Sequence, residues 1–178
     1  ELQRQLLSLP ADERAEADDF RLLLGLIAGA DTATGRSALQ QILAGGGERD
    51  KQRIALQALA RASTRDPARA QFRRDLDNLI GATEGHPILE SLLITRAQVA
   101  LGEKSYQQAE DDARALLEKY PGSSLKALAR GILTTSAWEQ RRYRGAADQA
   151  AQAAADLPPG PTRAALGVLI AEAWFRAR

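Results

Sequence analysis

The amino-acid sequence predicts an all-α protein of about nine helices and no sheet, built as an array of stacked helix hairpins. Apolar residues recur with the helical period of about 3.6, and no stretch alternates with the period of about 2 that strands require. The second half of the chain also repeats itself, which is typical of stacked units that cannot bury their apolar faces alone. Five residues return 37 positions later, namely Tyr106, Ala109, Asp111, Ala113 and Pro121 as Tyr143, Ala146, Asp148, Ala150 and Pro158. Five more return 36 positions later, namely Gly131, Ile132, Leu133, Ala137 and Trp138 as Gly167, Val168, Leu169, Ala173 and Trp174.

The first half of the chain contains four expected helices. The first carries apolar residues at i, i+3, i+4 and i+7, and a break from Asp31 to Gly35 separates it from a second helix that Gly45 to Gly47 end. Asp66 and Pro67 are expected to be the N-cap and the first residue of the fourth helix, and Gly81 to Pro87 form the next break. The apolar residues of the four helices are Phe20, Leu23, Leu24 and Ile27; Leu39, Ile42 and Leu43; Ile54, Ala58 and Leu59; and Phe72, Leu76, Leu79 and Ile80.

The second half contains five expected helices, so that the chain forms four helix pairs and a ninth, unpaired helix. The first of the five is expected to point Leu89, Leu92, Leu93, Ala97 and Ala100 inward. Proline and glycine separate the later helices, which is where helices end. The five ranges are Pro87 to Leu101, Ser105 to Tyr120, 124–141, 144–156 and 162–177.

The composition excludes several classes of function. The 24 lysine and arginine residues against 23 acidic residues leave a net charge of +1, so no overall field attracts nucleic acid or an anionic membrane. The chain has no cysteine, which excludes disulfides, zinc thiolates and cysteine nucleophiles. No apolar run approaches the ~20 residues of a membrane-spanning helix. We therefore expect no cofactor, no metal, no nucleic-acid partner and no direct insertion into a membrane.

The second half resembles the tetratricopeptide repeat, a family of stacked helix hairpins. The resemblance implies a right-handed α-α superhelix, or solenoid, whose repeats cover residues 86–178 with the last one incomplete. Residues 1–85 are then either degenerate helix hairpins or a differently packed helical cap. The matching pattern is Ala97-x2-Ala100-Leu101-x4-Tyr106-x2-Ala109-x7-Leu117-x3-Pro121.

The alanines of this pattern have a defined role in the family. Ala109 and Ala146 are expected to lie where the second helix of a hairpin crosses the first, because a larger side chain would hold the two backbones apart. Two residues depart from the pattern. Arg96 replaces the usual apolar residue of the first helix, and Thr134 stands where glycine or alanine is typical.

The two tryptophans are the strongest candidates for binding a partner. In the register of the resemblance, Trp138 and Trp174 occupy the twelfth position of a first helix, which faces the concave groove in tetratricopeptide proteins, and Leu101 is their equivalent one repeat earlier. A peptide-binding groove needs aromatic contact area with polar groups beside it. The alternative is that the two rings fill space between adjacent helices. The ninth positions, one helical turn away on the same face, are Gln98, Thr135 and Ala171.

Other chemistry-bearing residues are expected to have ordinary structural roles. His86, the single histidine, is expected in a surface turn. Glu110 to Asp112 are expected to be a solvated helix start, with a divalent-ion site as the alternative. Arg141, Arg142 and Arg144 are expected to stabilise a helix C-terminus, with an anion-binding patch as the alternative.

These features favour a non-enzymatic scaffold that binds a protein or peptide on its concave face. The alternative is a helical accessory domain of a larger bacterial enzyme or of an envelope assembly complex. The segment Tyr120-Pro121-Gly122-Ser123-Ser124 is similar to repeat boundaries in bacterial cell-envelope tetratricopeptide lipoproteins, a resemblance that implies the periplasm or cell envelope. Because the last expected helix has no second helix to cover it, we expect Trp174 and Phe175 to be partly exposed, either for self-association or through truncation.

Overall fold

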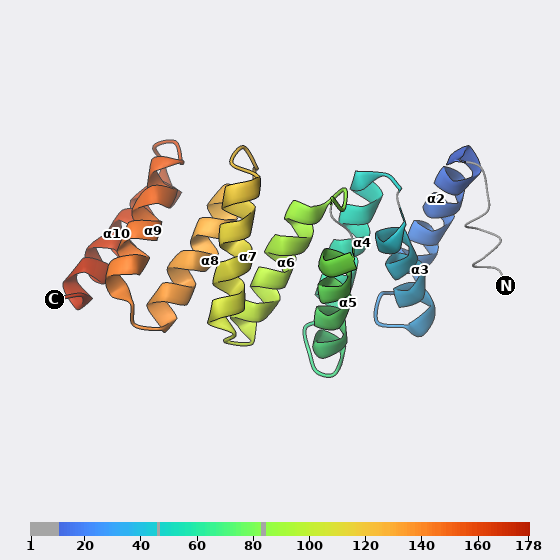
Figure 1. The fold of residues 1–178 in the computed structure, drawn as a ribbon, viewed down its shortest axis with the longest axis horizontal. Helices are drawn as coiled ribbons and strands as arrows, with labels where there is room; N and C mark the ends of the chain where they lie inside the picture. The colour runs from blue at the N-terminus through green and yellow to red at the C-terminus, as the bar shows by residue number, and fades with distance from the viewer. Residues whose placement is uncertain (1–10, 46, 83–84) are drawn as a thin grey trace. The chain divides into compact units, whose positions relative to one another are not determined.

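The computed structural model confirms the all-α fold class. It describes residues 11–45, 47–82 and 85–178, and these residues contain α-helices and no strand (Figure 1). The predicted helices of the second half begin and end within two residues of the observed ones. The helices are α2 (Ala11–Ala28), α3 (Ala33–Ala44), α4 (Arg49–Ala62), α5 (Ala68–Ala82), α6 (Leu89–Gly102), α7 (Tyr106–Lys119), α8 (Lys126–Glu139), α9 (Tyr143–Ala155) and α10 (Pro161–Arg176).

The chain divides into two compact units, residues 1–92 and 93–178. The division falls inside α6, whereas the sequence suggested a boundary between residues 85 and 86. None of the helices in the described ranges is both long and apolar enough to cross a membrane.

In the first unit, α2 and α3 pack through glycine. A Cβ atom on Gly25 would lie 2.5 Å from Cγ of Leu39, and a Cβ atom on Gly35 would collide with the carbonyl oxygen of Gly29. Gly35 belongs to α3 and not to the expected break, because Thr32 caps the helix by accepting a hydrogen bond from the Gly35 amide at 3.1 Å. The two backbones therefore approach more closely than larger residues would allow.

The face of α2 that packs differs from the row of apolar residues that marks this helix in the sequence. Phe20 is 67% exposed, Leu23 57% and Ile27 76%, whereas Leu24, the fourth residue of the row, is partly buried. The packed face carries Gly25, which is buried, and lies on the other side of the helix. Close approach at glycine is thus accompanied by exposure of most of the apolar row.

A buried glutamine joins α3 to α4. The C-cap of α3 is Gly45, as the glycine run predicts, and Gly46 lies outside the described residues. Gln52, fully buried on α4, donates a hydrogen bond from Nε2 to the Gly45 carbonyl at 2.6 Å. This bond satisfies a carbonyl that the end of the helix leaves without a helical partner.

Helix α5 begins one residue later than expected. The Asp66–Pro67 peptide bond is cis and the helix starts at Ala68, so Pro67 precedes the helix. Phe72 and Leu76 are buried, as the apolar pattern predicts.

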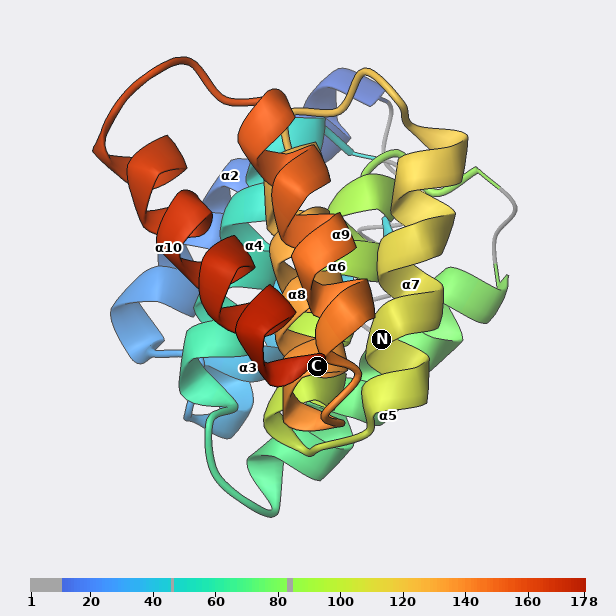
Figure 2. The same cartoon turned by 90° about the vertical axis from the view of Figure 1, so that its left-hand side faces the viewer.

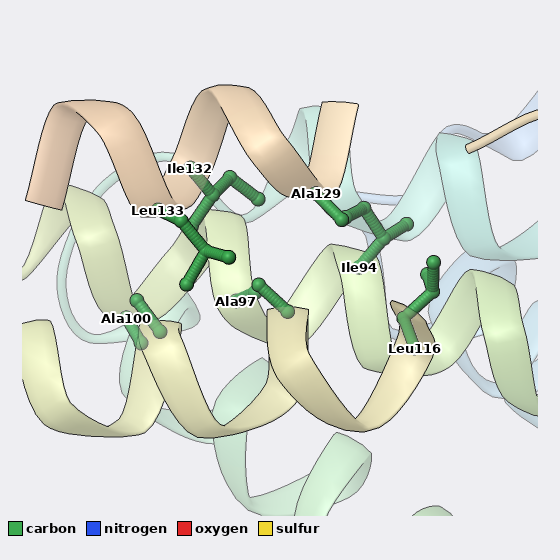
Figure 3. Packing of buried hydrophobic residues seen from close by; sticks show 9 residues of the cluster. Ile94, Ala97, Ala100, Leu116, Ala129, Ile132 and Leu133 are labelled. Atoms are coloured by element: carbon green, nitrogen blue, oxygen red, sulfur yellow. The ribbon is translucent and has the colours of Figure 1, made fainter. Parts of the chain in front are cut away.

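In the second unit, α6, α7 and α8 share one apolar core (Figure 3). Small residues dominate it, so the helices lie close together. Helix α9 adds a further row of buried alanines, and Ala109 and Ala146 are both fully buried, which confirms their predicted burial. The shared core consists of Ile94, Ala97, Ala100, Ala109, Ala113, Leu116, Ala129, Ile132 and Leu133.

The turns of the second unit repeat with the same offset of 37 that the sequence shows. Between α6 and α7, the Lys104 amide donates to the Leu101 carbonyl at 3.0 Å, and Lys104 has a φ of 60°. Between α8 and α9, the Arg141 amide donates to the Trp138 carbonyl at 2.9 Å, and Arg141 has a φ of 58°. The same left-handed turn therefore ends both helices and positions Leu101 and Trp138 equivalently.

Candidate partner-binding surface

The six predicted partner-binding residues lie in pairs on α6, α8 and α10 of the second unit. The two members of each pair are three positions apart, so they share one face of their helix. Gln98, Thr135, Ala171 and Trp174 are exposed, whereas Leu101 and Trp138 are half-buried. We call this set the first-helix surface: Gln98, Leu101, Thr135, Trp138, Ala171 and Trp174.

The two tryptophans have different surroundings. Trp138 packs edge-on against Tyr143, with ring centroids 5.4 Å apart and an angle of 75° between the planes. The guanidinium carbon of Arg176 lies 5.0 Å from the centroid of the Trp138 ring and 5.8 Å from that of Tyr143. Arg176 therefore connects α10 to α8 through a cation–π contact. Trp138 thus also packs between helices, which was the alternative role expected for the tryptophan rings.

Glu172 orients this arginine. Its Oε1 atom accepts hydrogen bonds from Nε of Arg176 at 3.0 Å and from Nη2 at 2.6 Å. The hydrogen bond that Arg176 donates to Glu172, followed by that with Tyr143, raises the pKa of Arg176 above its ordinary value. Trp138, Tyr143, Glu172 and Arg176 therefore form one cluster, the aromatic–arginine cluster, and Trp138 is its member in the first-helix surface.

Trp174 and Phe175 are exposed, as predicted for the last helix. The exposed fraction is 47% for Trp174 and 74% for Phe175. Leu101, in contrast, packs against the shared core of α6, α7 and α8. The structure thus links Trp138 to α10 through Arg176, while Gln98 and Thr135 reach solvent from separate helices.

Glu110 is not part of a solvated helix start, because it is buried. Its carboxylate accepts hydrogen bonds from Oγ of Ser136 at 2.7 Å and from Nε2 of Gln140 at 2.9 Å. It also pairs with Arg114 at 2.6 Å and contacts Nη2 of Arg142. Burial alone would raise the pKa of Glu110, but the hydrogen bond from Ser136 and the charges of the two arginines outweigh it, and the pKa lies below its ordinary value.

Asp112 is buried as well, and its partner is the arginine that departs from the family pattern. Nε of Arg96 donates to Oδ2 of Asp112 at 2.9 Å, and Nη2 donates to Oδ1 at 2.6 Å. This two-pronged pair joins α6 to α7. The presence of Arg96 in place of an apolar residue is thus matched by a carboxylate on the neighbouring helix.

The arginines near the turn between α8 and α9 do not act as one group. Arg142 contacts the carboxylate of Glu110, which it shares with Arg114. Arg141 and Arg144 are exposed. Of the three arginines expected to stabilise a helix C-terminus, Arg142 therefore takes part in an ion pair, whereas Arg141 and Arg144 face solvent.

His86 is buried and does not lie in a surface turn as expected. Its Nε2 atom lies 3.0 Å from the carbonyl oxygen of Leu43, and its Nδ1 atom accepts a hydrogen bond from the Ile88 amide at 3.3 Å. With Nδ1 as acceptor, Nε2 carries the proton and donates to Leu43. The ring therefore joins the segment before α6 to α3 through backbone groups of the first unit.

Two further charge pairs join helices near the surface. Lys51 on α4 lies 2.7 Å from Oδ1 of Asp19 on α2, and this hydrogen bond raises the pKa of Lys51. Asp156 accepts from Nζ of Lys126 at 3.0 Å and from Nε of Arg130 at 2.9 Å. The hydrogen bond from Lys126 lowers the pKa of Asp156 most. The charge of Lys126, and the hydrogen bond and charge of Arg130, lower it further.

Within the described parts of the chain, no group of three histidine, aspartate or glutamate side chains is arranged to hold a metal ion. The fold defines the class of the molecule as an all-α protein. Comparisons with protein-family models, with curated proteins and with solved structures find no match.

Proposed function

We propose that the chain is a non-enzymatic scaffold that binds a protein or a peptide on the first-helix surface. In this proposal, the second unit is a set of tetratricopeptide-like hairpins in a right-handed superhelix, and the first-helix surface is its concave face. The fold class supports the proposal, since helix hairpins that expose equivalent positions offer an extended contact area.

The observation that carries the proposal is the exposure of equivalent residues. Gln98, Thr135 and Ala171 all reach solvent, and each lies one helical turn before a large apolar residue. Helix-capping turns of the same conformation follow Leu101 and Trp138. The same repeated geometry therefore places polar and small side chains beside larger apolar ones, which suits the recognition of an extended chain.

The aromatic–arginine cluster provides a fixed part of this surface. Trp138 is held by Tyr143 and Arg176, so little side-chain freedom is lost when a partner contacts it. Trp174 is more exposed and supplies the free anchor, because tryptophan gives large contact area and an N–H donor.

Selection from a displayed peptide library tests the proposal. The affinity of the recovered peptides is then compared between the wild type and a Thr135→Arg/Ala171→Arg variant, in which two long charged side chains cover the surface. We expect binding to weaken at least about tenfold, which corresponds to about 1.4 kcal/mol. The matched control is Ala151→Arg, because Ala151 is an exposed alanine on α9.

The tryptophans provide the second arm of the test. Trp174→Ala should weaken binding without changing the unfolding free energy by more than about 0.5 kcal/mol, because the side chain is exposed. Unchanged affinity after replacement of both Trp138 and Trp174 would exclude the first-helix surface as the binding site.

A further inference from the structure

Helix α10 is apolar on two opposite faces. One face packs inward through Ala173, which is fully buried. Helix α9 lies beside α10 and contacts it (Figure 2). The opposite face carries Ala164, Val168, Ala171 and Phe175, all exposed, with Val168 at 70% and Phe175 at 74%. A helix that is apolar on all sides is typically covered on all sides. The α10 face, as we call these four residues, therefore has the composition of an interface.

Helix α2 has a comparable face in the first unit. Phe20, Leu23 and Ile27 are more than half exposed, and the exposed Glu16 continues their row toward the start of the helix. The packed side of α2, with Gly25, points toward α3. The α2 face, formed by Glu16, Phe20, Leu23 and Ile27, is thus a second apolar helix surface of the same kind.

The two faces match in spacing. Residues of the α2 face follow one another at intervals of four, three and four, and those of the α10 face at the same intervals. Alternation of three and four keeps a row on one side of a helix and is the spacing by which two helices pack against each other. The α2 face presents large side chains and the α10 face includes two alanines, so large residues of one helix can fit against small ones of the other.

The ends of the two faces also carry one pair of opposite charges. Other charges nearby are paired within the chain, Asp18 with Arg21, Asp19 with Lys51 and Glu172 with Arg176. Glu16 lies at the N-terminal end of the α2 face, and the exposed Arg178 lies three positions after Phe175 at the C-terminal end of the α10 face. An antiparallel arrangement brings these two opposite charges together.

We propose that the α2 face of one copy of this chain packs antiparallel against the α10 face of a second copy. The proposal does not rest on the peptide-binding function, although Ala171 belongs to both surfaces. The contact joins two different surfaces, so each copy keeps one free face after pairing, and association continues beyond the dimer or closes into a ring. The occupant is a second copy because the large side chains of the α2 face fit against the alanines of the α10 face, and because Glu16 and Arg178 carry opposite charges at ends that an antiparallel arrangement brings together.

Sedimentation of two face variants tests the proposal. The α2 variant carries Leu23→Glu and Ile27→Glu, and the α10 variant carries Val168→Glu and Phe175→Glu. All four positions are exposed, so circular dichroism should show unchanged helix content and unfolding. Both variants gain negative charge, so the two altered faces repel each other and cannot create a new contact.

The expected results distinguish this contact from symmetric ones. The apparent mass of the wild type should rise with protein concentration to more than twice the monomer mass of 19.2 kDa. Each variant alone should remain monomeric, and an equal mixture should form a dimer, because one intact α2 face and one intact α10 face are then present. A wild type that stays monomeric at about 0.5 mM overturns the proposal. Association of either variant alone, or a mixture that stays monomeric, overturns it equally.

A charge exchange tests the antiparallel orientation. Glu16→Arg and Arg178→Glu should each weaken association severalfold, and the chain that carries both changes should recover it. Failure of the double variant to recover contradicts the antiparallel arrangement.

Discussion

The α2–α3 crossing of the first unit and the α8–α9 crossing of the second both depend on small residues, but they differ in which ones. Glycine at positions 25 and 35 brings α2 and α3 so close that a Cβ atom would meet the neighbouring helix. Alanine lines α9, where Ala146, Ala147 and Ala150 are fully buried. A glycine contact buries little apolar surface, so large residues of α2 remain exposed. An alanine contact buries its own methyl groups, and the repeat pattern in the sequence then coincides with the packed face.

One ion pair in the second unit, Arg96–Asp112, is more buried than the Arg53–Glu90 pair of the first unit, and Arg96→Met is expected to show this difference most strongly. The substitution leaves the buried Asp112 carboxylate without its arginine, and loss of one partner of a buried pair costs about 3–5 kcal/mol. Urea unfolding gives the loss directly. The matched control is Arg53→Met in the first unit, whose partner Glu90 is 25% exposed, and here we expect a loss of at most about 1 kcal/mol.

The additional replacement Asp112→Leu distinguishes pairing from packing. If the cost of Arg96→Met comes from an unpaired carboxylate, the double variant should recover most of the stability. Equal losses for the Arg96 and Arg53 variants would contradict the difference between the two ion pairs.

Gly35→Ala is expected to cost about 1–3 kcal/mol in the first unit, because the new methyl group collides with the backbone at Gly29 and no side chain can move aside. Gly131→Ala on α8 is the matched control. Nothing lies within 4 Å of a Cβ atom there, so alanine should stabilise the helix by up to about 1 kcal/mol. Thermal unfolding of the two variants should therefore give shifts of opposite sign. An unchanged or higher stability of Gly35→Ala would exclude close glycine packing as the basis of the α2–α3 crossing.

The second unit should lose stability in acid through Glu110. Its pKa lies below the ordinary value of 4.5 in the folded protein. The carboxylate therefore contributes stability that is fully present above pH 4.5 and is lost as the pH falls through the lower folded value. The difference in unfolding free energy between the wild type and Glu110→Gln should be constant at neutral pH and shrink below pH 4.5. A difference that grows on acidification would contradict the observed hydrogen bonds.

Arg141→Gly is expected to have the smallest effect. Arg141 adopts a left-handed conformation with a φ of 58°, which glycine reaches without strain. The gain should stay below about 1 kcal/mol, because glycine also increases the freedom of the unfolded chain. Lys104→Gly, at the equivalent turn, should shift the melting temperature in the same direction. Opposite shifts would show that the two turns are not equivalent.

The parts of the fold that the sequence predicts correctly depend on neighbouring residues. Helix bounds and the burial of Ala109 and Ala146 follow from local periodicity and from the repeat. The predictions that were wrong concern residues whose contacts are distant in the sequence. Burial of Glu110 depends on Ser136, which lies 26 positions away, and burial of His86 depends on the Leu43 carbonyl, 43 positions away.

Some of these features left a signal in the sequence. The spacing of four residues between Glu110 and Arg114 is that of a helical ion pair. Gly25 within a helical pattern is itself a sign of close packing, since glycine otherwise weakens a helix. The exposure of Gln98, Thr135, Ala171 and Trp174 agrees with the repeat register, whereas Leu101 and Trp138 are half-buried. The contact of Arg176 with Trp138 joins two helices and has no local signal.

The equivalence of the repeated hairpins in the second unit is the central claim, since the first-helix surface depends on it. Unfolding free energies of Ala109→Leu and Ala146→Leu test it most directly, because both residues are fully buried at an offset of 37. We predict matched losses of about 1–3 kcal/mol from overpacking, and a change within about 0.5 kcal/mol for the exposed control Ala151→Leu. A large loss at one alanine and none at the other would contradict the claim.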